Sequence, residues 1–328
     1  MRPFDPLFRN THAQTIAGAF WRRPFDAARF PVTAAYHHTE PDVQILIHSQ
    51  RPAGAPRASL LLVHGLEGSS EAGYMVSAAH TALEAGFIAH RMNIRSCGGT
   101  EDRCHTLYHA GLSSDLRTLL EILSPRCGGN LFLCGFSLGA NQCLKAAGEL
   151  GDRARGLLAG VIAISTPVDL GACAQALKQR RNYLYQQRFL RNMTARLERR
   201  CRTRSDLFGP YVEAARTARD IWEFDDRVTA RFFGFDGADH YYGTQSSKLF
   251  LDGIRVPALV IQAEDDPMIP FEVYQHAAFR TNPNLHLVST PAGGHVGFLA
   301  RGGYRFWLDL VIRDWMVEVG NKRAASLV

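Results

Sequence analysis

The sequence lacks the long apolar runs that would place the chain across a membrane. Its longest apolar stretch lies near residues 157–164 and is far shorter than a membrane span. Polar side chains interrupt the apolar positions near the N-terminus, so no signal-peptide core is expected there: Arg9, Asn10, His12 and Gln14. We therefore expect a cytoplasmic protein with no transmembrane segment.

Motifs for metal and nucleotide chemistry are also missing. The seven cysteines lie between Cys97 and Cys201, and no pair has the spacing of a zinc site, so reduced and mostly buried thiols are expected. No H-E-x-x-H and no G-x-x-x-x-G-K-[ST] element occurs. The sequence therefore predicts no metal and no cofactor, and it gives no support to nucleotide hydrolysis.

What is present is the composition of a folded globular protein, with 328 residues, 46% of them hydrophobic and 21% charged. Short apolar, β-rich runs alternate with amphipathic segments, which is the pattern of a parallel sheet covered on both faces. We predict an α/β class with a mostly parallel, doubly wound sheet that begins with an antiparallel pair near 32–36 and 43–48. The other predicted strands lie near 59–63, 87–94, 131–133, 161–164, 258–261 and 285–288, and the predicted helices lie near 72–85, 111–123, 140–150 and 304–319.

The alternation stops between Pro167 and Ile254, in a stretch that has helical character and is too long for a simple connection. We predict that residues 168–253 form a helical cap inserted into a single domain that spans 1–328. Inserted segments of this kind often lie near an active site. Four phenylalanines of the stretch indicate either the lining of an apolar pocket or the core of the cap: Phe224, Phe232, Phe233 and Phe235.

The strongest local signal is a G-x-S-x-G element centred on Ser137, between a predicted strand and a predicted helix. A tight turn at this junction exposes the serine side chain, and the small residues Gly135 and Gly139 let the neighbouring backbone pass closely. Ser137 is therefore the candidate nucleophile. The alternative is an ordinary turn flanked by glycines.

A serine hydroxyl needs a base, and the base needs an acid that orients it. In this kind of fold the acid precedes the histidine along the chain. The strand near 258–262 leads into Glu264, Asp265 and Asp266. We select Asp266 because Pro267 fixes the turn after it, and Asp265 is the second choice. A solvated acidic turn without a catalytic role is the third interpretation.

The candidate base is His295, which lies in a glycine-rich loop after the last predicted strand. Most of the 13 histidines are expected to be structural or solvated. The candidate donors to an oxyanion are the backbone N–H groups of Leu66 and Leu138. His64 is expected to hold the loop that carries Leu66 by hydrogen bonds rather than to act as a base.

These residues resemble those of the α/β-hydrolase superfamily, and more closely its YheT-like branch, which includes abhydrolase-domain esterases and lipases. The similarity covers about residues 4–298. It is carried by Asn10-Thr11-His12-Ala13-Gln14-Thr15-Ile16, His64-Gly65-Leu66-Glu67-Gly68-Ser69-Ser70, Asn93-Ile94-Arg95-Ser96-Cys97-Gly98-Gly99, Leu107-Tyr108-His109-Ala110-Gly111, Gly135-Phe136-Ser137-Leu138-Gly139-Ala140-Asn141, Asp239-His240-Tyr241-Tyr242 and Gly293-Gly294-His295-Val296-Gly297-Phe298.

The resemblance implies an α/β-hydrolase fold and a triad of Ser137, Asp266 and His295 that hydrolyses carboxylic esters with short- to medium-chain acyl groups, acylglycerols included. It implies a small-molecule ester with an apolar acyl chain as the substrate. Two alternatives stay open. The same triad could transfer the acyl group to an alcohol, or the scaffold could bind a ligand without chemistry.

The net charge of +6 is unevenly distributed. Residues 178–204 contain ten basic side chains and only one acidic side chain, Glu198, so this segment carries +9. Three interpretations are open: a solvated helix face, peripheral contact with an anionic membrane surface, or nucleic-acid binding. Because no nucleic-acid-recognition motif is present, we expect no nucleic-acid partner.

Overall fold

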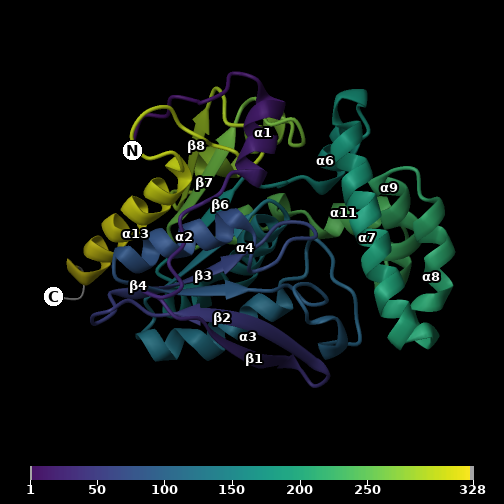
Figure 1. Cartoon of the computed structure of the whole chain (residues 1–328), viewed down its shortest axis with the longest axis horizontal. Coiled ribbons are helices and arrows are strands. Elements are labelled where there is room, and N and C mark those ends of the chain that lie inside the picture. The colour runs from purple at the N-terminus through teal and green to yellow at the C-terminus, as the bar shows by residue number, and fades with distance from the viewer. Residues whose placement is uncertain (1, 326–328) are drawn as a thin grey trace.

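In the computed structural model, which describes residues 2–325, eight strands form one sheet in the order β1-β2-β4-β3-β5-β6-β7-β8 (Figure 1). β1 pairs antiparallel with β2 and β2 with β4, and the remaining neighbours are parallel. The predicted α/β class and the antiparallel first pair are confirmed. The strands are β1 (Thr33–Glu40), β2 (Val43–Gln50), β3 (Ala58–Val63), β4 (Phe87–Met92), β5 (Leu131–Phe136), β6 (Gly160–Ile164), β7 (Ala258–Ala263) and β8 (Leu285–Thr290).

Helices cover both faces of the sheet, as the alternating sequence pattern predicts. α2 and α13 lie on one face, and α3 and α4 lie on the other. The helices are α1 (Thr11–Phe20), α2 (Gly73–Glu84), α3 (Ser114–Leu123), α4 (Leu138–Leu150), α5 (Ala154–Leu157), α6 (Leu170–Leu177), α7 (Tyr183–Thr203), α8 (Ser205–Thr217), α9 (Ile221–Phe224), α10 (Ala230–Phe233), α11 (Ala238–Gln245), α12 (Ala278–Thr281) and α13 (Trp307–Ala325).

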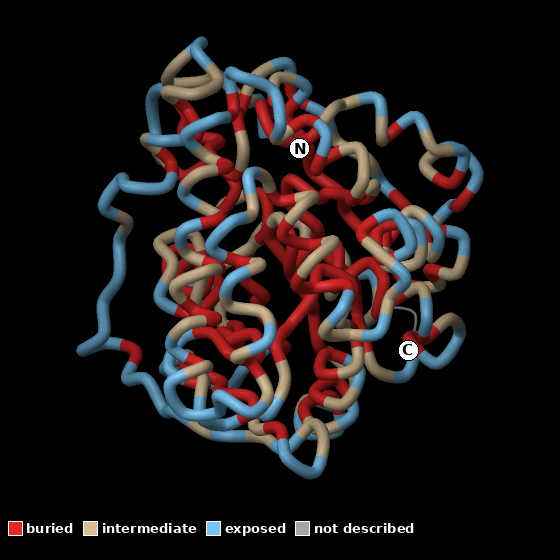
Figure 2. Tube along the Cα trace, turned by 90° about the vertical axis from the view of Figure 1, so that its right-hand side faces the viewer, coloured by how far each residue is buried: buried red, intermediate tan, exposed pale blue. Residues whose placement is uncertain are grey.

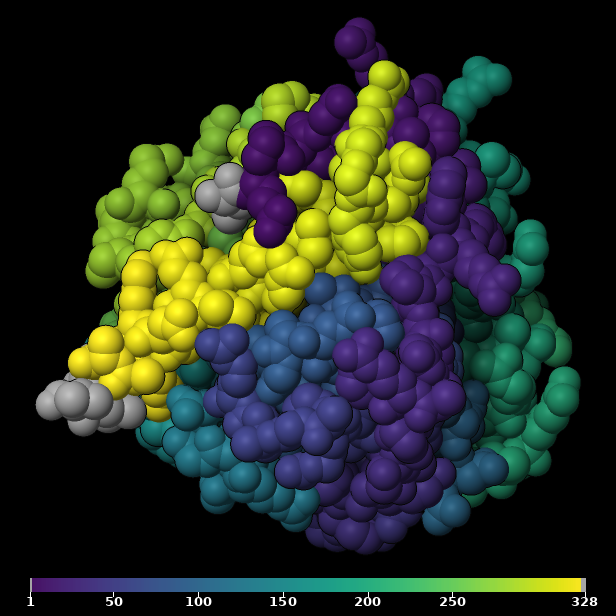
Figure 3. All heavy atoms as spheres, turned by 60° about the vertical axis from the view of Figure 1, so that its left-hand side comes forward, coloured from purple at the N-terminus to yellow at the C-terminus, as the bar shows by residue number. Residues whose placement is uncertain are grey.

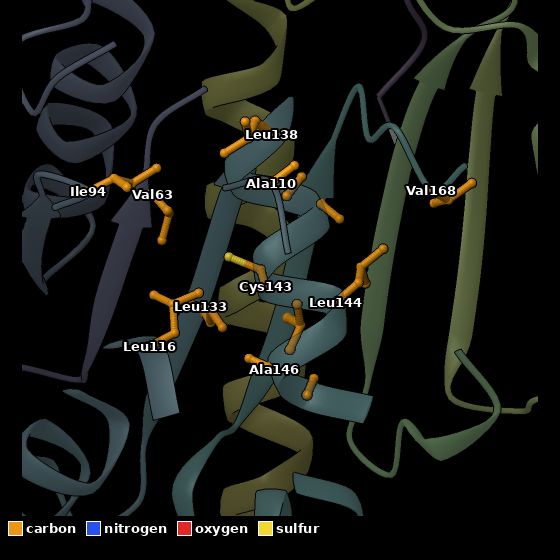
Figure 4. Close-up of a cluster of buried hydrophobic side chains, with 14 of the residues drawn as sticks. Val63, Ile94, Ala110, Leu116, Leu133, Leu138, Cys143, Leu144, Ala146 and Val168 are labelled. Atoms are coloured by element: carbon orange, nitrogen blue, oxygen red, sulfur yellow. The ribbon is translucent and has the colours of Figure 1, made fainter. Parts of the chain in front are cut away.

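The core follows the alternation of side chains along the central strands. Leu61 and Val63 of β3 belong to the cluster with α3 and α4, whereas Leu60 and Leu62 belong to the cluster with α2 and α13. Figure 4 shows side chains of α4 packed against those of β3 and β5. The burial of these apolar faces fixes β5 and α4, and therefore the turn between them that carries Ser137, in one relative position.

The stretch between β6 and β7 contains α6 to α11, and no strand lies among these described residues. These helices stand together at the carboxyl ends of the parallel strands (Figure 1). Figure 2 views the molecule from the side on which α7 and α8 lie and shows exposed segments around a mostly buried centre. They have a small core of their own, which includes Leu197, Phe208 and Val228. The domain boundaries and the interpretation of 168–253 as a cap stay predictions.

Two features depart from the sequence-based expectation. α3 begins at Ser114 rather than near 111, and Gly111 lies in the preceding loop, where a Cβ atom on it would lie 2.5 Å from the Gln245 side chain. α1 was not expected as a helix. The segment that leads into it pairs with the C-terminal part of the chain through Leu7 N and Leu299 O, at 2.7 Å (Figure 3).

The seven cysteines are free thiols, and five of them are buried. Within residues 2–325, no helix combines the length and the apolar character needed to cross a bilayer.

Candidate active site

Ser137 occupies the turn between β5 and α4 in a conformation that side chains rarely adopt, with φ at 52° and ψ at −122°. The turn leaves no room for side chains on either side of it. A Cβ atom on Gly135 would lie 2.5 Å from the carbonyl oxygen of Gly139, and one on Gly139 would lie 2.7 Å from that of Val63. The glycines of the G-x-S-x-G element are therefore required by backbone packing.

The structure brings Ser137, His295 and Asp266 together in a chain of hydrogen bonds. His295 Nε2 lies 2.9 Å from Ser137 Oγ, and His295 Nδ1 lies 2.9 Å from Asp266 Oδ2. In the neutral imidazole, the Nδ1–H group donates to the carboxylate and Nε2 accepts the serine proton. This is the geometry that lets a histidine act as a base toward a serine.

The structure distinguishes between the three acidic residues after β7 that are candidates for the acid that orients His295. Asp266 has a fully buried side chain, and its Oδ1 accepts hydrogen bonds from Met268 N and Ile269 N. Asp265 Oδ1 instead accepts from the backbone N–H of Gly294 at 2.9 Å. Glu264 accepts from the exposed Ser289 hydroxyl. Of the three, Asp266 is the one that contacts the imidazole.

α1 supports the loop that carries His295. Thr15 Oγ1 accepts a hydrogen bond from His295 N at 2.9 Å, and Gly18 lies so close to Gly297 that a Cβ atom on it would be 2.6 Å from Gly297 Cα. Thr11 Oγ1 donates to Asp265 O. The sequence interpretation did not assign these roles. The only signal was the spacing of Thr11 and Thr15, which places both on one side of a helix.

The two candidate oxyanion donors are free of other partners. Within the described residues, the N–H groups of Leu66 and Leu138 have no hydrogen-bond acceptor. Leu138 opens α4, so its N–H group is one of those that a helix leaves unpaired at its N-terminus. His64 does not compete as a base, since Nδ1 donates to Gly65 O and Nε2 accepts from Ile94 N. Burial lowers the pKa of His64 to about 4.

A buried ion pair connects α7 to the loop that carries Leu66. Arg196 Nε donates to Glu67 Oε1 at 2.9 Å, and the two side chains are 5% and 6% exposed. The Tyr108 hydroxyl donates to the same carboxylate and accepts from Glu67 N. Glu67 has a φ of 53°, which costs free energy for a residue with a side chain. These contacts hold the residue next to Leu66 in that strained conformation.

A mostly apolar pocket opens at Ser137 and His295 and extends beneath the helices that follow β6. Of the four phenylalanines considered from the sequence, Phe224 lines this pocket. Phe232 and Phe233 instead pack with the core of the helical segment, and Phe235 packs with the main core. The apolar lining consists mainly of Leu66, Leu107, Leu138, Leu170, Ala174, Leu177, Phe189, Met193, Ile221, Phe224, Met268 and Ile269.

A few polar groups reach the same pocket. Asp225 accepts hydrogen bonds from the hydroxyls of Thr229 and Tyr242, and burial raises the pKa of its carboxyl to about 6. A second, more polar opening also reaches Ser137 and His295, between α1, the Leu66 loop and α7. Among the described residues, no group of three or more His, Cys, Asp or Glu side chains could hold a metal ion.

Comparisons with known proteins give the family of the chain. Residues 60–304 match the profile of the Alpha/beta hydrolase family. YheT of Escherichia coli (strain K12), whose esterase designation is provisional, is 30% identical over 95% of this chain and 92% of its own. The monoacylglycerol lipase of Saccharomyces cerevisiae is 30% identical over 77% of this chain and 58% of its own.

A solved structure supports the fold alone. The Pyrococcus furiosus esterase Pf2001 superposes with a TM-score of 0.56 at 15% identity, over 92% of this chain and 95% of its own. The family match and the similarity to YheT confirm the resemblance to the YheT-like branch, and the superposition agrees with the α/β-hydrolase fold.

The contrast between Asp266 and Asp265 yields the first prediction. We expect Asp266→Asn to lower kcat for 4-nitrophenyl butyrate by about 10³- to 10⁴-fold, because an amide cannot hold the required imidazole tautomer. Asp265→Asn is the matched control, because an amide oxygen can still accept from Gly294 N, and its kcat should stay within about tenfold of the parent value. Steady-state kinetics decide, and an equal loss in the two variants contradicts the assignment.

The ion pair of Arg196 and Glu67 yields the second prediction. Arg196→Met should lower kcat by about 10- to 100-fold with little change in KM, because the Leu66 N–H group loses its fixed direction. Arg196→Lys should restore part of kcat. Arg200→Met removes an equally buried arginine of α7 whose contacts, Cys104 O and Thr106 O, lie outside the loop. If Arg200→Met lowers kcat as strongly, the effect reflects general destabilisation.

Proposed function

This chain belongs to the alpha/beta hydrolase family, and we propose that its Ser137, His295 and Asp266 form a catalytic triad that works through an acyl-enzyme. The family match and the esterase and lipase relatives make the protein a carboxylic ester hydrolase. The roles of the residues rest on one observation above all, the hydrogen-bonded chain from Ser137 Oγ through the imidazole to the buried Asp266 carboxylate.

In the proposed reaction, Ser137 Oγ attacks the ester carbonyl carbon while His295 Nε2 takes the hydroxyl proton. The N–H groups of Leu66 and Leu138 donate to the oxyanion, and Asp266 stabilises the imidazolium. The carbon–oxygen bond to the alcohol then breaks, and His295 gives its proton to the leaving oxygen. A water molecule attacks the acyl-enzyme by the same route, which releases the acid and restores Ser137.

We further propose that the pocket beneath α6, α7 and α9 takes the acyl chain of the substrate. Its lining is mainly leucine, isoleucine, methionine and phenylalanine, and it begins at the nucleophile. The second opening would then admit the alcohol part of the ester, because it reaches Ser137 from the other side and has a more polar rim. Short- to medium-chain acyl esters, acylglycerols included, fit a site with an apolar pocket for the acyl chain and a more polar opening for the alcohol part.

Removal of the nucleophile tests the triad. Ser137→Ala should lower the hydrolysis of 4-nitrophenyl butyrate by about 10⁴-fold or more, because no other hydroxyl lies within reach of His295 Nε2 among the described residues. A fluorophosphonate probe should label the parent protein and not this variant. Ser289→Ala, which removes a hydroxyl distant from the site, should keep both activity and labelling. Unchanged turnover in Ser137→Ala would overturn the proposal, and a parent that is neither active nor labelled would favour a non-catalytic scaffold.

A series of 4-nitrophenyl esters tests the acyl pocket. We expect kcat/KM to rise by about fourfold for each added methylene from acetate toward octanoate, because each buried CH₂ contributes about 0.8 kcal/mol. The rise should stop when the chain fills the pocket. A flat or falling series from acetate onward would show that the apolar pocket does not receive the acyl chain, without any bearing on the triad.

A further inference from the structure

Exposed apolar side chains gather in two segments that are distant in the sequence. Of the nine large hydrophobic residues that stand out as exposed in the described chain, six lie in or just after α1 or at the start of α7. Phe20 is 70% exposed and Leu184 is 75% exposed. The other four are Ile16, Trp21, Phe25 and Tyr183.

These two segments are neighbours in space. His12 Nδ1 lies 3.0 Å from the Tyr185 hydroxyl, and their rings stack. The Arg188 guanidinium lies over the Phe20 ring, 5.3 Å from its centroid. Figure 1 shows α1 on the side of the N-terminal end of α7. The second opening to Ser137 lies between them, since Ile16 and Phe20 line it on one side and Arg188 lines it on the other.

The same two segments carry basic side chains and no acidic ones. Residues 6–25 and residues 178–197 contain no Asp or Glu. Within the described chain, six exposed arginines of these segments make no hydrogen bond or ion pair: Arg9, Arg22, Arg180, Arg181, Arg188 and Arg191.

The far half of α7 is different. Arg199 pairs with Glu101, and Arg204 after the helix end pairs with Asp206, while the Arg200 side chain is buried against Cys104 O. The structure thus leaves the arginines of residues 180–191 without an ion-pair partner in the described chain, whereas Lys178 pairs with Asp220 and Arg196 with Glu67. Toward the end of the segment, Arg202 alone has neither an ion-pair nor a hydrogen-bond partner among the described residues.

We propose that residues 16–25 and 180–191, here called the docking face, bind the surface of an anionic phospholipid membrane. Such a surface offers negative headgroups for the unpaired arginines and an apolar layer for Phe20, Trp21 and Leu184. Tryptophan and arginine beside exposed aliphatic side chains suit this boundary. A second copy of the chain is a poor occupant, because two such faces would bring their unpaired arginines together.

The docking face surrounds the opening that leads to Ser137, so a docked protein would receive an ester directly from the lipid layer. This consequence rests on the proposed function, whereas the binding itself does not. Binding can therefore be measured with Ser137→Ala protein, which leaves the vesicles intact, and activity can be measured separately on a water-soluble ester.

Co-sedimentation with vesicles tests the binding. Vesicles of phosphatidylcholine with about one third phosphatidylglycerol should carry down the protein, pure phosphatidylcholine vesicles should carry down much less, and high salt should release it. In Arg180→Gln/Arg181→Gln, the partition coefficient should fall by about tenfold or more, because each basic residue near such a surface strengthens binding by about fivefold. Leu184→Ser should also weaken binding. Brominated phosphatidylcholine in the anionic vesicles should quench the tryptophan fluorescence of the parent more than that of Trp21→Phe.

Matched substitutions outside the docking face are the controls. Arg199→Gln/Arg202→Gln removes the same charge from the other half of α7, and Leu249→Ser replaces an exposed leucine elsewhere. These variants should bind as the parent does. When Ser137 is present, the docking-face and control variants should all hydrolyse 4-nitrophenyl butyrate at the parent rate. No binding to anionic vesicles, or equal loss in the control variants, would overturn the proposal. So would a dimer in light scattering that Leu184→Ser dissociates without lipid.

Discussion

The site depends on how closely the backbone packs at the turn between β5 and α4. Gly135 passes against Gly139, and Gly139 passes against the end of β3, with no space for a Cβ atom at either position. Ser137 is held in its strained conformation between them, and its N–H group bonds to Ile164 O of β6. The packing of the buried apolar faces of β3, β5 and α4 stabilises this turn and offsets the free-energy cost of the strained Ser137 backbone.

The other parts of the site are fixed by polar contacts from distant segments. Asp266 is oriented by two backbone N–H groups in the turn after β7, and the His295 loop is held by Thr15 of α1 and by Asp265. The loop of Leu66 is held by Glu67, which Arg196 reaches from α7. The proposed nucleophile, base and oxyanion donors are therefore positioned by separate elements that meet at the carboxyl ends of the strands.

α7 contributes to the site along its length in different ways. Its buried face carries Met193 toward the apolar pocket and Arg196 toward the Leu66 loop, while its exposed N-terminal residues border the opening beside α1. One helix thus joins the proposed acyl pocket, the loop of the proposed oxyanion donor Leu66 and the proposed docking face. Displacement of α7 would disturb all three, which links the helices after β6 to the chemistry at Ser137.

The sequence by itself determined the class of the fold and the identity of the nucleophile candidate. Apolar runs mark buried strands locally, and G-x-S-x-G between a strand and a helix describes a turn whose geometry depends on its own residues. It also narrowed the acid to three neighbouring carboxylates and pointed to His295. The sequence did not predict the roles of α1 and Arg196, because their contacts join residues separated by more than a hundred positions.

Only the tertiary structure decided which carboxylate meets the imidazole, since Asp265 and Asp266 differ by one position and the turn after β7 aims them apart. The tertiary structure also distinguished the arginines of the basic segment from one another. The sequence alone does not show which of them are buried or paired. Whether an arginine is buried, paired or left at the surface depends on the carboxylates and rings that folding brings beside it. That placement separates Arg196 and Arg200 from the unpaired Arg180 and Arg181.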